Sequence, residues 1–336
     1  MEDKVLLAHG SGGKLSHDLI EKSFVSSLSN PILDRLDDSA VFEISGSGRL
    51  AFTTDSYVVS PIFFPGGDIG KLAVCGTVND LSMSGATPLY LSLSFIIEEG
   101  LLITDLEKIV NSVHQAAIEA GIKIVTGDTK VVNRGGADKL FINTSGIGIV
   151  PPGVDISGAN AQPGDKVIVS GTLGDHGIAV LSQREGLKFQ VPVPSDCSPL
   201  NKLVAKMLET SANIHCLRDP TRGGLATTLN EFARQSRVGI NINEASIPVN
   251  RAVAGACELL GFDPLYVANE GKLVAVVTAA DADKVLAKMR QNRYGHEATI
   301  IGEVVNEHPG RVVMKTRLGA SRLVDVLVGE LLPRIC

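Results

Sequence analysis

Turn-forming residues cluster at two neighbouring places near the middle of this chain and divide it. They are Pro151–Gly153 and Gln162–Gly164, and each cluster adjoins a strand-like apolar run. Proline and glycine at this density are typical of a connecting loop, and a chain of 336 residues commonly forms one large or two ordinary domains. We therefore predict domains at residues 1–152 and 163–329, with a mobile tail at 330–336.

Both halves mix helices and strands. The clearest helix is 104–120, where apolar residues recur at helical spacing and Thr104 with Glu107 predicts a capping box. Further helices are predicted over 68–86, 200–208, 225–233 and 280–289, and strands over 50–54, 122–126, 240–243, 273–278, 298–305 and 312–315. Because strands and helices do not alternate evenly, the pattern favours an α/β chain of α+β layers over a doubly wound sheet.

The composition excludes several classes of protein. A net charge of −6 without a long basic run argues against a nucleic-acid binder. No apolar stretch reaches the length of a membrane span, and residues 1–7 lack the apolar centre of a signal peptide. Five cysteines are scattered without a CxxC pair, which indicates neither a zinc site nor a disulfide framework. We expect a cytoplasmic protein with reduced thiols.

A glycine-rich run, His9–Lys14, precedes a helix predicted from Leu15. The backbone amides of Gly12 and Gly13, together with the Lys14 side chain, could hold phosphate oxygens at the helix N-terminus. The run is not a Walker A loop, because Leu15 stands where that loop has the Ser or Thr that binds magnesium. A flexible N-terminal arm is the alternative interpretation.

Acidic residues stand at strand ends or in turns at five places, and most have apolar or glycine neighbours. They are Asp37–Asp38, Asp55, Asp80, Asp128 and Asp219. Magnesium ions take carboxylate oxygens, usually one or two from the protein with phosphate and water completing the shell. Asp80 is the most informative, because its predicted helix is otherwise apolar or small and an unpaired buried carboxylate is costly. A cap or turn role would explain any one of them, but the whole set favours a magnesium–nucleotide site.

The chain ends in Arg334-Ile335-Cys336 after Pro333, which ends any preceding helix. Chain ends are usually mobile, so the Cys336 thiol could enter a pocket, react and be presented to a partner. It is not a prenylation signal, which needs the cysteine four places from the end. Lys130 and Glu270 each follow a strand-like run and precede a turn, and on their own they would be surface charges.

Taken in order, the motifs DDSA, TTDS, VNDLSMSGA, GDTKV, RDPTRGGLA and ANEG resemble the ATP-binding superfamily of aminoimidazole ribonucleotide synthetase. Within it, the opening HGSGGK and the terminal PRIC are similar to the hydrogenase maturation factor HypE. The resemblance runs through nearly the whole chain. It implies a two-domain PurM-like fold whose N-terminal domains pair in a homodimer, with ATP bound near that interface.

The resemblance also implies a reaction and partners. The carbamoyltransferase HypF would load a carbamoyl group onto Cys336, and ATP-dependent dehydration would convert it to a thiocyanate. The cyanide would then pass to iron in the HypC–HypD complex, during nickel–iron hydrogenase maturation. No nucleic acid and no membrane take part.

Roles for individual residues follow from the resemblance. Glu270 would be the general base, and Lys130 would orient or polarise the carbamoyl group. The residues expected to bind ATP are Gly12, Gly13, Lys14, Asp55, Asp80, Asp128 and Arg222. Those expected to hold Mg²⁺ are Asp38, Asp55, Asp80 and Asp219, and the choice between Asp37 and Asp38 stays open.

Two other functions compete with this one. A selenide water dikinase-like phosphotransferase shares the acidic motifs but normally has a Cys or selenocysteine just before the lysine of its N-terminal loop, where this chain has Gly13. A non-catalytic carrier with a modified Cys336 would bind ATP only as a conformational ligand. The full set of acids argues against the carrier, because it exceeds what passive nucleotide binding needs.

Overall fold

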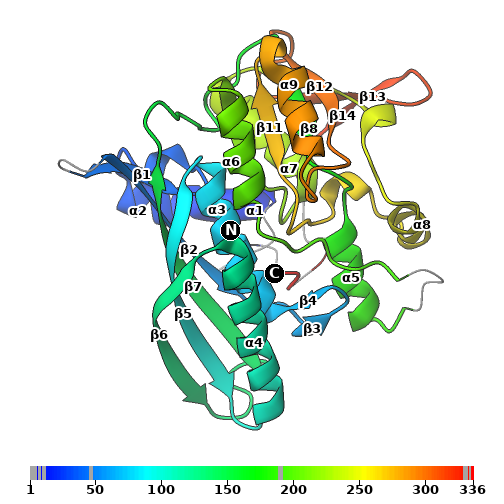
Figure 1. Ribbon diagram of the computed structural model, residues 1–336. Coiled ribbons are helices and arrows are strands. Elements are labelled where there is room, and N and C mark those ends of the chain that lie inside the picture. Colours follow the sequence, from blue (N-terminus) through cyan, green and yellow to red (C-terminus); the bar gives the residue numbers. More distant parts are fainter. Residues whose placement is uncertain are drawn as a thin grey trace.

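The computed structural model describes residues 6, 9, 13–44, 48–187, 192–327, 332 and 334–336. Figure 1 shows two sheets, each covered by its own helices, with the C-terminus lying between them near α5 (Asp175–Arg184) and the short hairpin of β3 (Phe63–Phe64) and β4 (Gly67–Asp68). Placing the chain end between two sheets makes residues from both available to it.

The first sheet has five strands in the order β1-β2-β7-β5-β6. Their bounds are β1 Ala40–Ile44, β2 Gly48–Tyr57, β5 Thr87–Glu98, β6 Lys123–Val132 and β7 Leu140–Val150. Only β5 and β6 pair in parallel, and the other neighbours are antiparallel. Alternate residues of β2 and β7 point to the same face of the sheet, and those facing the helices are buried.

Two helices, α3 (Ile69–Met83) and α4 (Ile103–Ala120), pack against one face of this sheet. Asp68 caps α3 by accepting the backbone N–H groups of Gly70 and Lys71. Nearly every residue of α3 is buried, because the sheet, α4 and the second half of the chain surround it. Before the sheet, α1 (Lys14–Leu19), a π-helical segment (Ile20–Val25) and α2 (Ser26–Leu28) form the N-terminal segment.

The second sheet has seven strands in the order β14-β13-β10-β12-β8-β11-β9. Their bounds are β8 Lys166–Val169, β9 Ile214–Arg218, β10 Gly239–Asn243, β11 Val274–Val277, β12 Thr299–Val305, β13 Val312–Lys315 and β14 Ser321–Val324. Helix α7 (Gly224–Ser236) covers one face, while α6 (Asn201–Thr210) and α9 (Ala279–Arg290) cover part of the other. Helices α5 and α8 (Arg251–Leu260) form a smaller cluster beside them.

Asn79, on α3, joins the two halves of the chain. Its side-chain N–H groups lie 3.1 Å from the Ser198 carbonyl oxygen and 3.3 Å from the Glu270 carbonyl oxygen, and its own oxygen accepts the Leu200 N–H at 2.8 Å. Asn79 is fully buried, so these bonds form without competition from water. The helix that carries Asp80 therefore also holds the turn that carries Glu270.

The expected layers are confirmed, because most neighbouring strands are antiparallel and the described residues form no doubly wound sheet. Helix α4 begins one residue before the predicted 104–120, but the predicted capping box is wrong: its N-cap is Leu102, without a side-chain cap. The apolar run at 122–126 predicts a short strand that is buried, but β6 is longer and mostly exposed because it is an edge strand. The boundaries at 152 and 163 stay predictions.

Candidate active site

Three of the predicted acids converge from separate elements. Asp38 lies in the loop before β1, Asp80 on α3, and Asp219 directly after β9. Thr53 on β2 donates its hydroxyl to Asp80 Oδ2 at 2.8 Å. Arg218 Nε lies 2.8 Å from Asp38 Oδ1, and the same guanidinium pairs with Glu231 on α7.

Burial raises the pKa of these carboxyl groups, and their negative neighbours raise it further. The pKa of Asp38 rises to about 6, although Arg218 opposes the shift. The pKa values of Asp80 and Asp219 are well above the ordinary value, with burial as the first cause and the other acids as the second. The cluster has too little positive charge of its own, so a bound cation would stabilise it.

Asp37 and Asp38 have different surroundings. Asp37 accepts the Ser157 hydroxyl at 3.0 and 3.1 Å, the Gly158 N–H at 3.1 Å and the Arg35 Nε–H at 3.1 Å. It thereby ties the segment before β1 to the second half of the chain. Asp38 points to the acid cluster instead, so it is the better placed of the two to meet a cation.

A cleft of about 550 Å³ opens beside the acid cluster. Asp38, Asp80, Asp219 and Arg222 lie at its charged end. Apolar residues of the N-terminal segment and of the loop between it and β1 also line the cleft, namely Ile20, Ile32, Leu33 and Leu36. Charged and apolar residues in one cleft suit a nucleotide, whose phosphates and base differ in the same way.

The glycine-rich run lies only partly within the described residues. Gly12 falls outside them, while Gly13 is buried and stands at the N-cap of α1. Lys14 is exposed, and its backbone N–H binds the Leu327 carbonyl oxygen at 3.1 Å. Ser16 and His17 from the same helix line the cleft, so α1 borders it. Phosphate binding by Gly13 and Lys14 stays a prediction.

Lys130 does not precede a turn, and Asp128 is not at a strand end or in a turn, as predicted. Both lie within β6, with their side chains 2.7 Å apart and exposed. The register places Lys130 beside Ile96 of β5, whose outward face lies opposite α3 and α4. Strand β6 is three strands from β2, about 14 Å at the usual spacing. One chain therefore does not bring Lys130 to the tail, which runs beside the residues following β2.

The tail is docked between the two sheets. The Val58 N–H donates to the Cys336 carbonyl oxygen at 3.1 Å, and the Ser60 N–H donates to the Arg334 carbonyl oxygen at 3.2 Å. Ile335 is 2% exposed and packs in the hydrophobic core that the first sheet forms with α3 and α4. Pro333 lies outside the described residues. The structure thus holds the inward position that the sequence predicts for a tethered thiol.

Glu270 is buried, and its charge raises the pKa of the docked Cys336 thiol. It is 2% exposed, and its Oε1 has no hydrogen-bond partner among the described residues. Burial raises the pKa of Glu270 well above its ordinary value, and the nearby Cys197 and Asp219 raise it further. A buried carboxyl oxygen without a partner is an unusual cost in a folded chain, and such costs concentrate at functional sites.

The turn that carries Glu270 is tightly built. Asp196 accepts the Glu270 N–H at 3.1 Å and the Gly271 N–H at 3.2 Å. A Cβ on Gly271 would lie 1.8 Å from the Asp196 carbonyl oxygen, so only glycine fits there. With Asn79 holding the Glu270 carbonyl from the other side, the turn has little freedom to move.

Burial also raises the pKa of the Cys336 thiol, to about 12, while Arg222 opposes the shift. The Cys336 charge is in turn the largest cause that raises the pKa of Arg222. The charges of Glu270, Asp55 and Asp219 raise the pKa of the same thiol further. In the docked tail the thiol is therefore protonated at neutral pH.

Some residues of the site were not anticipated. Tyr57 follows Asp55 by two positions on β2, and its hydroxyl donates to Asp55 Oδ2 at 3.1 Å. Arg218 and Asn79 are buried positioning groups for Asp38 and Glu270. Asn79 and Arg218 stand beside the predicted Asp80 and Asp219, but nothing in the sequence indicates that their side chains would bridge distant segments.

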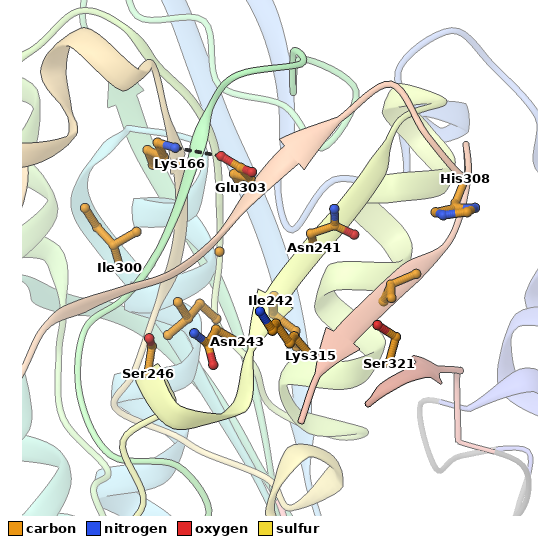
Figure 2. Close-up of a pocket in the computed structure, with 13 residues that line it drawn as sticks. Lys166, Asn241, Ile242, Asn243, Ser246, Ile300, Glu303, His308, Lys315 and Ser321 are labelled. Carbon is orange, nitrogen blue, oxygen red and sulfur yellow. Dashed lines mark hydrogen bonds and ion pairs between the residues drawn. The ribbon is translucent and has the colours of Figure 1, made fainter. Parts of the chain in front are cut away.

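A separate groove of about 570 Å³ lies on the second sheet, where α6 and α9 leave its face uncovered. Figure 2 shows Lys166 paired with Glu303 there, with Asn241, Asn243 and Lys315 on the neighbouring strands. None of the predicted site residues lines it. The candidate active site is therefore the acid cluster with the docked tail, and not this groove.

The described part of the chain contains neither a metal-ligating cluster of three side chains nor a membrane-spanning helix. No three His, Cys, Asp or Glu side chains there converge closely enough to hold a metal ion by themselves. This fits Mg²⁺, which commonly takes one or two protein carboxylates and leaves its other positions to phosphate and water. Within the same residues, no helix has the length and apolar character needed to cross a membrane.

Comparisons with known proteins place the chain in a family. Residues 36–150 match the AIR synthase related protein N-terminal domain, and residues 162–315 match the C-terminal domain of the same proteins. The carbamoyl dehydratase HypE of Cupriavidus necator is 54% identical over 333 residues, which cover 99% of this chain and 95% of that protein.

Solved structures agree with the family models. The HypE chain of a HypE–HypF complex is 51% identical, with a TM-score of 0.88, over 92% of this chain and 99% of that one. HypE in complex with ATP is 52% identical, with a TM-score of 0.84, over 99% of this chain and 100% of that one. The two-domain fold is thus the PurM-like fold that the sequence resemblance implied. The chain belongs to the carbamoyl dehydratase HypE family of the AIR synthase related proteins.

Proposed function

We propose that this chain uses ATP to dehydrate an S-carbamoyl group on Cys336 to a thiocyanate during hydrogenase maturation. The observation that carries the proposal is the docked tail, in which the Val58 N–H holds the backbone of Cys336 and the charges of Arg222, Glu270 and Asp219 all act on the Cys336 thiol. Relatives named carbamoyl dehydratase, and related structures with ATP and with HypF, support it.

The cleft beside the acid cluster is the proposed ATP site. The apolar residues would receive the base, and Arg222, the amides of Gly12 and Gly13, and Lys14 would meet the phosphates. The carboxylates proposed for Mg²⁺ are Asp38, Asp55, Asp80 and Asp219, with one or two of them binding each ion. The raised pKa values of Asp38, Asp80 and Asp219 support a cation there, which would neutralise charge on the triphosphate.

The proposed chemistry converts an amide into a nitrile. The carbamoyl oxygen attacks the γ-phosphorus of ATP and ADP leaves, which turns that oxygen into part of a good leaving group. The C–O bond then breaks with loss of phosphate, the nitrogen gives up its two protons, and a carbon–nitrogen triple bond forms. In-line placement and charge neutralisation are the main contributions that a protein makes to the first step.

Glu270 is the proposed base for the protons on nitrogen. A buried carboxylate with a raised pKa is a stronger base than an exposed one, and Oε1 of Glu270 has no hydrogen-bond partner among the described residues to compete for the proton. Arg222 would offset the negative charge that gathers around the thiol and the phosphate.

We propose that the chain forms a homodimer through the outward face of its first sheet. Phe52, Tyr90, Ile96 and Ile149 are each about 40% exposed on this sheet, which is unusual for large apolar side chains. Lys130 and Asp128 lie on the same sheet. Since Lys130 is remote from the tail of its own chain, we propose that both residues serve the active site of the other subunit.

Mixed dimers test this assignment. Lys130→Ala and Glu270→Gln homodimers should each be inactive, but chains unfolded and refolded together should recover about a quarter of the wild-type activity. Half of the randomly paired dimers are mixed, and each mixed dimer holds one intact site. Activity that stays at the level of the separate variants would show that Lys130 does not act across the interface.

The remaining partners follow from the chemistry. HypF would load the thiol, and the HypC–HypD complex would accept the cyanide at its iron. The thiol must leave the buried site to meet either of them, so the tail would alternate between inward and outward positions. We place the reaction in the cytoplasm, and the five free cysteines support a reducing compartment.

Mass spectrometry of the C-terminal peptide tests the function. After carbamoylation and addition of Mg²⁺ and ATP, the peptide should lose the mass of one water, and omitting Mg²⁺ should prevent the loss. A carrier would keep the carbamoyl mass, and a selenide water dikinase-like enzyme would consume ATP with selenide while the tail stayed unchanged. Either result would rule out the proposed dehydration.

A further inference from the structure

The docked tail uses its backbone on two sides. Towards the first sheet, the Cys336 and Arg334 carbonyls accept the Val58 and Ser60 N–H groups, and Arg334 Nε donates to the Val58 carbonyl at 2.9 Å. The carbonyl of Ile335, between them, is directed to the second half of the chain. Its partner there is His176 Nε2, at 2.8 Å.

His176 is fully buried near the start of α5, and its hydrogen bonds define which nitrogen carries the proton. A carbonyl oxygen can only accept, so Nε2 must carry hydrogen toward Ile335. Burial lowers the pKa of His176, although Asp196 opposes the shift, so the ring is neutral and Nδ1 is bare. Nδ1 therefore accepts the Ser195 hydroxyl at 2.8 Å, and Ser195 Oγ accepts the Cys197 N–H at 3.0 Å.

Helix α5 contacts the tail a second time. Arg184, eight residues after His176, donates from Nη2 to the Arg334 carbonyl at 2.8 Å and from Nε to the Ser60 carbonyl at 2.7 Å. Residues eight apart lie about 80° apart around a helix, so one broad side of α5 receives consecutive carbonyls of the tail. The Arg334 carbonyl also has a backbone donor, whereas the Ile335 carbonyl has His176 as its side-chain donor.

We propose that His176 is a positioning residue for the reacting thiol, whose Nε2–H holds the Ile335 carbonyl and so fixes Cys336 in its docked place. The inference deepens the proposed function and rests on it. The Ile335 carbonyl and side chain are both buried in the docked tail. Without the His176 donor, the Ile335 carbonyl loses this hydrogen bond when the tail is docked, whereas water can bond to it when the tail is undocked. The substitution should therefore favour the undocked tail.

Two amide substitutions separate this role from a structural one. Gln places its amide near the position of His Nε2 and can still donate to the Ile335 carbonyl. Asn places its amide near the position of Nδ1, where it can bond to Ser195 but not reach the tail. His176→Gln should preserve docking, and His176→Asn should weaken it. If His176 only supports Ser195 and its loop, the order of the two variants would be reversed.

Alkylation of Cys336 reports the docking equilibrium without any need for ATP or turnover. Cleavage after Lys315 releases the peptide 316–336, whose only cysteine is Cys336, and the four buried cysteines elsewhere are internal references. With iodoacetamide, we expect alkylation about ten times faster than wild type for His176→Asn, and within about threefold for His176→Gln. Single-turnover dehydration should slow about tenfold in the Asn variant only.

The proposal is overturned if Cys336 of the Asn variant is alkylated at the wild-type rate, or if both variants are alkylated equally fast. It is also overturned if only the Gln variant is alkylated faster than wild type. Thermal unfolding gives a second test, in which His176→Asn is compared in the full chain and in a chain ending at Arg334. The destabilisation should disappear in the shortened chain, and an equal loss in both would overturn the proposal. Since alkylation needs no chemistry from the enzyme, docking can be tested even if the proposed dehydration fails.

Discussion

A chain that ends at Ile335 should fold, dimerise and bind ATP, but it should form no thiocyanate. The loss should be complete because the sulfur of Cys336 carries the substrate in the proposed reaction, and no other described cysteine lies on the docked tail. Cys336→Ser keeps the backbone bond to Val58 and is the matched control for docking. We expect the free energy of unfolding of both variants within about 1 kcal/mol of wild type.

The measurements are peptide mass after incubation with HypF, carbamoyl donor and ATP, together with thermal unfolding and the size of the assembly in solution. Both variants should show no mass change at the C-terminus. Cyanide production by either variant would mean that the carbamoyl group travels on another residue. A large loss of stability or of the dimer would mean that the tail is a structural element first.

Glu270→Gln should slow dehydration by about a hundred- to ten-thousandfold, which is the usual contribution of a general base. Glutamine has nearly the same size and shape but cannot take a proton from the carbamoyl nitrogen. ATP affinity should stay unchanged, because Glu270 does not line the cleft proposed to bind the nucleotide. The neutral side chain should not destabilise the fold strongly, since burial already disfavours the charged form of Glu270.

Single-turnover mass spectrometry of the loaded tail measures the rate, and calorimetry measures ATP binding. Glu303→Gln is the matched control: its side chain is 49% exposed and pairs with Lys166 on the groove of the second sheet, so it should not change the rate. Wild-type turnover by Glu270→Gln would remove this residue from the mechanism. Loss of ATP binding in that variant would place it in the nucleotide site instead.

Local patterns in the sequence predicted elements well wherever one face of the element decides its structure. Helix α4 shows this, because its apolar residues recur on one buried face. Strand β6 shows the limit: Ile122 to Thr126 is apolar enough for a core strand, yet the strand lies at the edge of its sheet. Whether a strand has one neighbour or two depends on the order of the strands in the sheet, which no local pattern records.

The site shows the same limit more strongly. Asp80 could be singled out because a carboxylate in an apolar helix needs a reason. Asp37 and Asp38 could not be separated, since the difference lies in contacts with Ser157 and Arg218, more than a hundred residues away. The roles of Glu270 and Lys130 came from family resemblance, and the remoteness of Lys130 from its own tail became visible only with the strand order.

The docked, partly buried position of Cys336 also affects when its thiol can react. A rise in pKa from 9.0 to about 12 lowers the fraction of reactive thiolate at neutral pH by about a thousandfold. The resting protein is thus shielded from stray electrophiles and oxidants, although it carries a cysteine at its very end. We therefore expect loading by the transferase to require an undocked tail for two reasons. Undocking brings the Cys336 thiol within reach of the partner, and it lowers the thiol pKa so that more reactive thiolate forms.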